Sequence, residues 1–107
     1  MFKKKNKEQA LGTSFDRLLN YNYTPSKSID EQFIELAEVL MENRPIAINF
    51  EEISPTTEVD RAVAFLSGVV YALNGEVHRL GPKTFLFASD VALKDGTIRY
   101  YISDVGK

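Results

Sequence analysis

The chain has 107 residues, of which 44% are hydrophobic and 26% are charged, as in an ordinary globular protein. This length holds a single domain with a two-layer core and excludes a second domain. The lack of cysteine and the single histidine exclude disulfides, thiolate metal sites and histidine-rich metal sites. We therefore expect neither a metal nor a cofactor.

Charge is unevenly distributed along the chain. Residues 1–19 carry a net charge of +3, and the remaining residues carry −5, within an overall −2. An acidic domain repels a phosphate backbone, so we expect no nucleic-acid partner. No apolar run approaches the roughly 18 residues that span a bilayer, and the N-terminus lacks the apolar core of a secretory signal. The expected location is the cytoplasm.

Residues 1–19 are interpreted as a basic, amphipathic N-terminal segment. Its apolar side chains recur at helical spacing, which predicts a short helix from about Thr13 to Leu19. Three environments remain open for this segment: an anionic membrane surface, a groove of a protein partner, or loose docking on its own domain. The membrane interpretation, which makes the protein peripheral on the inner membrane face, uses Phe2, Lys3, Lys4, Lys5, Phe15, Leu18 and Leu19.

Residues 20–107 are expected to form one α/β core domain. Alternation of apolar and polar residues over 19–24 predicts a short strand. Ser28 followed by Glu31 resembles a capping box, and helical spacing continues from there to Met41. The apolar run 46–50 then predicts a buried central strand.

The next helix, over residues 60–75, is apolar on two opposite sides. One side carries Val63, Leu66 and Val70, as expected of a helix that packs on its own core. Apolar residues on the other side predict a helix-to-helix contact between two copies of the chain. The alternative is that Gly68 lets a strand or loop of the same chain pass close by. The predicted dimer contact consists of Arg61, Ala64, Phe65, Gly68, Tyr71 and Ala72.

Two hairpins are predicted after this helix. The first joins strands at 76–80 and 83–88 through Gly81-Pro82, and the second joins 91–93 to 97–102 through Asp95-Gly96. The expected fold is an α/β sandwich of the α+β class. Its two helices pack on one face of a mixed sheet of four to five strands.

No catalytic set is evident. His78 stands alone in a predicted strand, no nucleophile elbow surrounds a serine, and no glycine pattern suits a phosphate. We therefore expect that the protein is not an enzyme. Its exposed apolar surface indicates association instead.

A family resemblance is carried by the run RAVAFLSGVVYALNGEVHRLGPKTFLFA at 61–88. This run resembles the core of SepF, a cell-division protein family with the pattern R-x-x-D-F-[LA]-S-G-x-x-[YF]-A-L-x-G-x-[IV]-x-[KR]-[IL]-G-x-x-[IVT]-F-[LA]. Upstream, RPIAINF at 44–50 resembles the second strand of the family, and Ala64 stands where the family usually has aspartate. The matching positions are Phe65, Ser67, Gly68, Tyr71, Ala72, Leu73, Gly75, Arg79, Gly81 and Phe85.

The resemblance implies a non-catalytic septum-assembly protein. SepF-like proteins form homodimers or higher polymers and tether the tubulin-like division GTPase FtsZ to the inner face of the membrane. Their core captures the C-terminal tail of FtsZ in a largely apolar pocket. Arg79, at the basic position of the motif, would pair with an acidic group of the tail, and Phe85 would supply apolar contact. Leu80 and Phe87 complete the expected tail-binding set.

Two other functions stay open. One is a SepF-like paralogue without membrane anchoring that regulates division or another partner through the same dimer. Family members commonly place a long linker between the membrane helix and the core, and here barely twenty residues precede the first predicted strand. The other is a small regulatory α/β domain that binds a metabolite.

Overall fold

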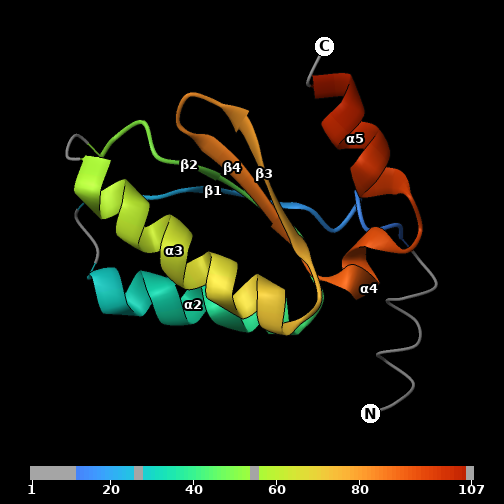
Figure 1. The fold of residues 1–107 in the computed structure, drawn as a ribbon, viewed down its shortest axis with the longest axis horizontal. Coiled ribbons are helices and arrows are strands. Elements are labelled where there is room, and N and C mark those ends of the chain that lie inside the picture. Colours follow the sequence, from blue (N-terminus) through green and yellow to red (C-terminus); the bar gives the residue numbers. More distant parts are fainter. Residues whose placement is uncertain (1–11, 26–27, 54–55, 106–107) are drawn as a thin grey trace.

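The computed structural model describes residues 12–25, 28–53 and 56–105, in which two strand–helix pairs are followed by a hairpin and two helices (Figure 1). Of the predicted membrane-binding residues, Phe2, Lys3, Lys4 and Lys5 lie outside the described residues. The elements are β1 (Leu19–Asn22), α2 (Ile29–Met41), β2 (Ile46–Asn49), α3 (Thr56–Ala72), β3 (Glu76–Gly81), β4 (Thr84–Ala88), α4 (Asp90–Leu93) and α5 (Thr97–Val105).

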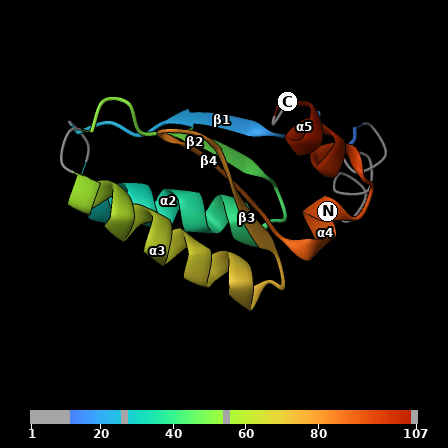
Figure 2. The ribbon, with the colours of Figure 1, turned by 45° about the horizontal axis from the view of Figure 1, so that its top comes forward.

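The four strands form one mixed sheet in the order β1-β2-β4-β3. β1 runs parallel to β2, whereas β2 and β3 both run antiparallel to β4. Helices α2 and α3 lie side by side on one face of the sheet, and α4 and α5 lie at its end and pack against residues of its other face (Figure 2). The predicted α/β sandwich with two helices on one face is therefore confirmed, as is the hairpin β3–β4. A bulge interrupts this hairpin between Arg79 and Gly81.

The ends of α2 and α3 follow the signals in the sequence. The hydroxyl of Ser28 accepts a hydrogen bond from the backbone N–H of Glu31 (3.4 Å), so the predicted N-terminal cap of α2 is confirmed. The chain leaves α2 and α3 through Asn43 (φ 64°) and Asn74 (φ 57°). Both asparagines adopt the left-handed conformation that closes a helix C-terminus.

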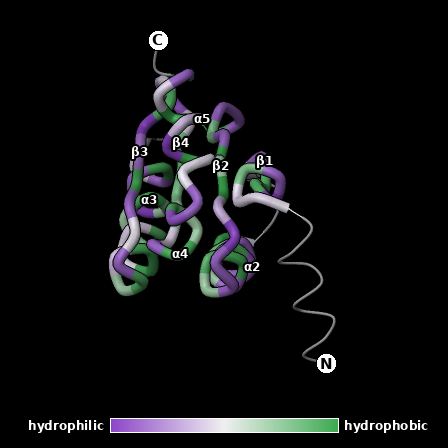
Figure 3. Tube along the Cα trace, turned by 90° about the vertical axis from the view of Figure 1, so that its right-hand side faces the viewer, coloured by the Kyte–Doolittle hydropathy of each residue, from purple (hydrophilic) through white to green (hydrophobic). Residues whose placement is uncertain are grey.

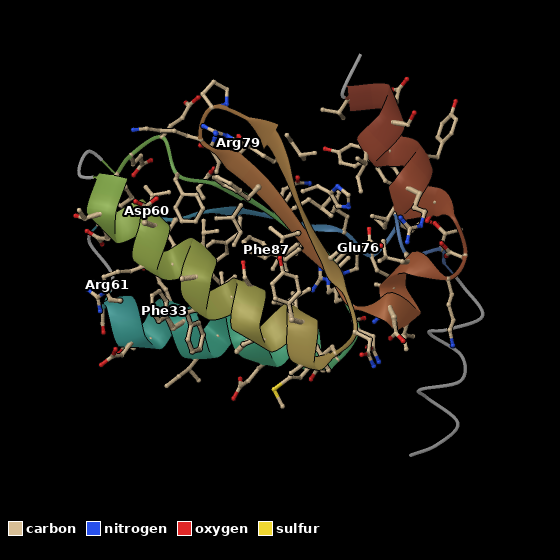
Figure 4. All side chains as sticks on the ribbon, viewed as in Figure 1. Phe33, Asp60, Arg61, Glu76, Arg79 and Phe87 are labelled. Atoms are coloured by element: carbon tan, nitrogen blue, oxygen red, sulfur yellow. The ribbon has the colours of Figure 1, made fainter. Side chains whose placement is uncertain are left out.

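The main core lies between the sheet and helices α2 and α3. Both helices are amphipathic, so hydrophobic and hydrophilic segments alternate along them (Figure 3). Figure 4 shows the labelled ring of Phe87 between the sheet and α3. The fully buried residues of this core include Leu36 and Leu40 of α2, Ile46 and Ile48 of β2, Leu66 and Val70 of α3, and Phe87 of β4.

One polar side chain is also fully buried in α2. The amide of Gln32 donates to the carbonyl oxygen of Thr24 (2.9 Å) and accepts from the backbone N–H of Thr24 (3.1 Å). The hydroxyl of Tyr21 donates to the same amide oxygen (3.1 Å). Burial of the Gln32 amide is tolerated because the amide makes these hydrogen bonds. The same bonds hold the end of β1 against α2.

The prediction of a second hairpin around Asp95-Gly96 is wrong, because helices α4 and α5 occupy this segment. The hydroxyl of Ser89 accepts from the N–H of Ala92 (3.2 Å) and caps α4. The carboxylate of Asp95 accepts from the N–H of Thr97 (3.0 Å) at the start of α5. Gly96 takes a left-handed φ of 80° between the two helices. The turn signal was therefore real, but it joins helices rather than strands.

The helix predicted from Thr13 to Leu19 is a single turn. The N–H of Arg17 donates to the carbonyl oxygens of Thr13 and Ser14, and β1 already begins at Leu19. Two reciprocal bonds close the turn: the Asp16 N–H donates to the Thr13 hydroxyl, and the Thr13 N–H donates to the Asp16 carboxylate (both 3.1 Å). Residue 19 is needed for the sheet, so the helix cannot extend further.

A matched pair of glycine substitutions tests this packing. A Cβ atom on Gly75 would collide with the carbonyl oxygen of Ala88 and lie 2.7 Å from Cα of Ser89. One on Gly68 would have no heavy atom of the described residues within 4 Å beyond its chain neighbours and the backbone of its own helix. We expect Gly75→Ala to lower the free energy of unfolding by about 2–3 kcal/mol. Gly68→Ala should raise it by about 0.5–1 kcal/mol, because alanine favours a helix. Urea unfolding at low protein concentration measures both, and equal stabilities would refute the described approach of β4 to Gly75.

Candidate functional site

The outward side of α3 is an exposed surface of small and aromatic residues. All six residues predicted for the dimer contact are exposed, and Phe65 and Tyr71 are 40% and 61% exposed. Apart from its chain neighbours and the backbone of its own helix, no described atom would lie within 4 Å of a Cβ on Gly68, so no described strand or loop of the same chain passes over this glycine. The sequence prediction of an uncovered apolar side on α3 therefore agrees with its burial pattern.

Helix α2 extends this surface. The ring of Phe33 stacks on that of Phe65, with centroids 4.7 Å apart and planes 9° from parallel. Ile34 and Met41 are 59% and 62% exposed and, seven residues apart, share one stripe of α2. Neither residue was predicted as part of a surface, because the helical spacing over 29–41 indicated a single core-facing side. We call this surface the helical face; it comprises Phe33, Ile34, Met41, Ala64, Phe65, Gly68, Tyr71 and Ala72.

The hairpin β3–β4 brings together only part of the predicted tail-binding set. Arg79 and Phe85 are paired across the strands, and Cζ of Arg79 lies 5.6 Å from the centroid of the Phe85 ring. Phe85 is partly buried and meets the ring of Phe50 edge-on. Phe87 is fully buried in the main core, and Leu80 packs in a second cluster. Arg79 and Phe85 are thus the two residues that share a surface.

The hairpin turn holds the Arg79 side chain in place. Its Nε donates to the carbonyl oxygen of Gly81 (3.1 Å), and its Nη2 donates to that of Pro82 (2.8 Å). Arg79 is exposed, at the tip of the hairpin labelled in Figure 4. Arginine presents further N–H groups in a fixed plane, so this guanidinium can still donate to a carboxylate from solvent.

The opposite side of the hairpin is joined to α5 by an ionic network. Nη1 and Nη2 of Arg99 donate to the two carboxylate oxygens of Glu76 (3.0 and 2.7 Å), and Nε2 of His78 lies 2.8 Å from the same carboxylate. The Arg99 guanidinium, and then the His78 ring, lower the pKa of Glu76 from 4.5 to about 2. His78 thus pairs with a carboxylate of its own strand.

The second cluster lies on the side of the sheet away from α2 and α3. Leu86 and Ala88 of β4 pack there against helices α4 and α5, and Leu18, in the N-terminal region, is partly buried against the same cluster. Leu19 is partly buried against the main core. Of the predicted membrane-binding residues that the structure describes, Phe15 alone is exposed, and its ring contacts Tyr101 of α5.

The described residues contain no group of histidine, aspartate and glutamate side chains that could hold a metal ion. None of the helices in this part of the chain combines the length and hydropathy needed to cross a bilayer. What the described surface offers is an apolar helical face and a cationic, aromatic hairpin, and such surfaces suit binding to other macromolecules.

Comparison with known proteins identifies the family of this chain. Residues 26–91, which include α2, β2, α3 and the hairpin β3–β4, match the family described as Cell division protein SepF. The chain belongs to the SepF family. Among its relatives, Cell division protein SepF of Lactobacillus helveticus (strain DPC 4571) is 39% identical over 64 residues, which are 60% of this chain and 43% of the relative.

Two further relatives named Cell division protein SepF are similar at the same level. The protein of Listeria monocytogenes serotype 4a (strain HCC23) is 42% identical over 64 residues, covering 60% of this chain and 41% of the relative. That of Lactobacillus delbrueckii subsp. bulgaricus (strain ATCC 11842) is 42% identical over 64 residues and covers 46% of the relative. The match thus spans less than half the length of these SepF relatives.

The ionic network gives a pH-dependent stability. The folded pKa of Glu76 lies below its usual value, so the network stabilises the fold fully above pH 4.5 and loses its contribution as pH falls from 4.5 towards 2. We expect Glu76→Gln to be less stable than the native chain at pH 6 and to show a smaller loss between pH 5 and 2. Thermal unfolding across this range measures both effects. Parallel curves for the two proteins would contradict the assigned pKa.

Proposed function

We propose that this SepF-family chain is a non-catalytic division adaptor that dimerises through the helical face and binds the C-terminal tail of FtsZ. The observation that carries the proposal is the exposed, apolar side of α3 around Gly68. Membership in the SepF family supports the role in cell division.

The helical face suits a symmetric contact between two copies. The small residues Ala64, Gly68 and Ala72 recur every four positions and let a second α3 approach closely. The rings of Phe65 and Tyr71 flank this line and would add apolar area to the contact. In a two-fold dimer the same patch meets itself, so α2 and α3 of both copies would form a four-helix layer.

A charged substitution in the centre of this face tests the dimer. Gly68→Lys should place a long ammonium side chain between the two α3 helices and yield a monomer, because burying an unpaired charge is costly. The native chain and a control, Ser103→Lys on the exposed side of α5, should remain dimers. Light scattering gives the masses. Dimers of Gly68→Lys, or a monomeric native chain, would refute the contact.

The tail-binding proposal rests on Arg79 and Phe85. The guanidinium would pair with an acidic group of the tail, while the exposed part of the Phe85 ring beside it would contact an apolar side chain. Phe87 and Leu80 would contribute indirectly, Phe87 through the core and Leu80 through the second cluster that supports β3.

Calorimetric titration with a peptide of the FtsZ C-terminal tail tests this assignment. The native chain should bind the peptide, and Arg79→Ala should weaken binding by about tenfold, through loss of a charge-assisted hydrogen bond. Lys94→Ala, which removes an exposed charge near α4, should bind as the native chain does. Absence of heat with the native chain at high peptide concentration would refute the proposal, and equal affinity of Arg79→Ala would refute the role of this arginine.

We further propose that the N-terminal lysines attach the protein to the inner membrane face. Because residues 13–19 are bonded into the fold, charge substitution is a cleaner test than truncation. Replacing Lys3, Lys4 and Lys5 by glutamine should reduce co-sedimentation with phosphatidylserine vesicles by more than about tenfold, and replacement by arginine should preserve it. Equal pelleting of both variants would favour the paralogue without membrane anchoring.

A further inference from the structure

A hollow of about 510 Å³ lies between the turn at residues 13–16 and helix α5. Three aromatic rings line it: Phe15 from the turn, and Tyr100 and Tyr101 from α5. Phe15 and Tyr101 are in contact, with centroids 5.3 Å apart, and Tyr100 is 76% exposed. The hollow lies outside the residues that match the SepF family, and the proposed function makes no use of it.

Hydrogen bonds between the two walls fix the shape of this hollow. The carboxylate of Asp95 accepts from the backbone N–H groups of Ser14 (2.8 Å) and Thr97 (3.0 Å). The hydroxyl of Thr97 accepts from the backbone N–H of Phe15 (3.0 Å). The hydrogen bond from the Ser14 N–H is the main reason why the pKa of Asp95 lies below its usual value. The Asp95 side of the hollow is therefore negatively charged at neutral pH.

The lining selects the charge of a ligand. Two carboxylates, Asp95 and Asp104, stand beside the three rings. An anion would be repelled by both carboxylates, whereas an ammonium group could pair with a carboxylate and lie over the electron-rich face of a ring. The flexible apolar stem of a lysine would fill the aromatic part of the hollow. The chemistry therefore suits a lysine side chain.

The chain carries such side chains directly before the hollow. Lys3, Lys4, Lys5 and Lys7 precede Gly12, which adjoins the lining residue Thr13. Lys7 is five residues from Gly12, an extended reach of about 17 Å. A ligand on so short a tether has an effective concentration on the order of millimolar, so a weak site can be occupied.

We infer that the hollow beside α5 binds the ammonium group of a lysine supplied by residues 1–11 of the same chain. A lysine held there is withheld from anionic lipid headgroups. The hollow therefore competes with the membrane for the same positive charges. This consequence rests on the proposed membrane attachment, whereas the binding itself does not.

Paramagnetic relaxation tests the binding without any membrane. The chain has no cysteine, so Asn6→Cys gives one site for a nitroxide label on the 107-residue chain. We expect relaxation of the amide signals of Tyr100 and Asp104 at low salt. Replacing Lys3, Lys4, Lys5 and Lys7 by glutamine leaves the tether unchanged and should reduce this relaxation by about threefold, through loss of the cation–ring and ion-pair contacts.

Substitutions in the hollow provide the second arm. Asp104→Asn and Tyr100→Ala should each reduce the relaxation of neighbouring α5 signals. Asp60→Asn should not, because this exposed carboxylate lies on α3, far from α5 (Figure 4). Equal relaxation with and without the lysines would overturn the inference, since the tether alone would then explain it. An equal reduction by Asp60→Asn would overturn it too, by showing a general charge effect.

Discussion

The structure depends on strand β4, which is apolar on both faces of the sheet. Phe87 faces α2 and α3, while its neighbour Leu86 faces the opposite side, and both are fully buried. A strand of this kind needs a cover on each face. Helices α2 and α3 supply one cover, and α4, α5 and Leu18 supply the other. The helical face lies on the first of these covers, and the hollow beside α5 adjoins the second.

Much of the fold could be predicted because local signals and periodicity agreed. In α2 the capping serine indicated the start, and the helical spacing continued to Met41, where the helix ends. The C-terminal segment could not be assigned in this way. Ile98 and Ile102 are four residues apart, so they would share one face of a strand and also one face of a helix. The Asp95-Gly96 turn signal favoured the strand, whereas the segment is helical. The continuous apolar run in β4 was the available sign that the second face needed a cover.

The candidate site, like the fold, could be predicted only in part from the sequence. The exposed side of α3 was predictable, since a helix with two apolar sides has only one core to face. The resemblance alone could not show which residues of the tail-binding set face solvent and which are buried. Arg79 and Leu80 are adjacent in β3, so their side chains point to opposite faces. The hollow beside α5 depends on contacts more than eighty residues apart in sequence, and no local pattern announces such contacts.

The bulge at the end of β3 has a further consequence for assembly. β3 is an edge strand, and a regular edge offers free backbone groups on which another sheet can grow. The irregularity between Arg79 and Gly81, together with the arginine side chain folded over the turn, interrupts that row of groups. Uncontrolled strand-to-strand growth, the route to amyloid-like aggregation, is thereby discouraged at this edge. The proposed contact through the helical face, which lies on α2 and α3, would not involve this protected edge.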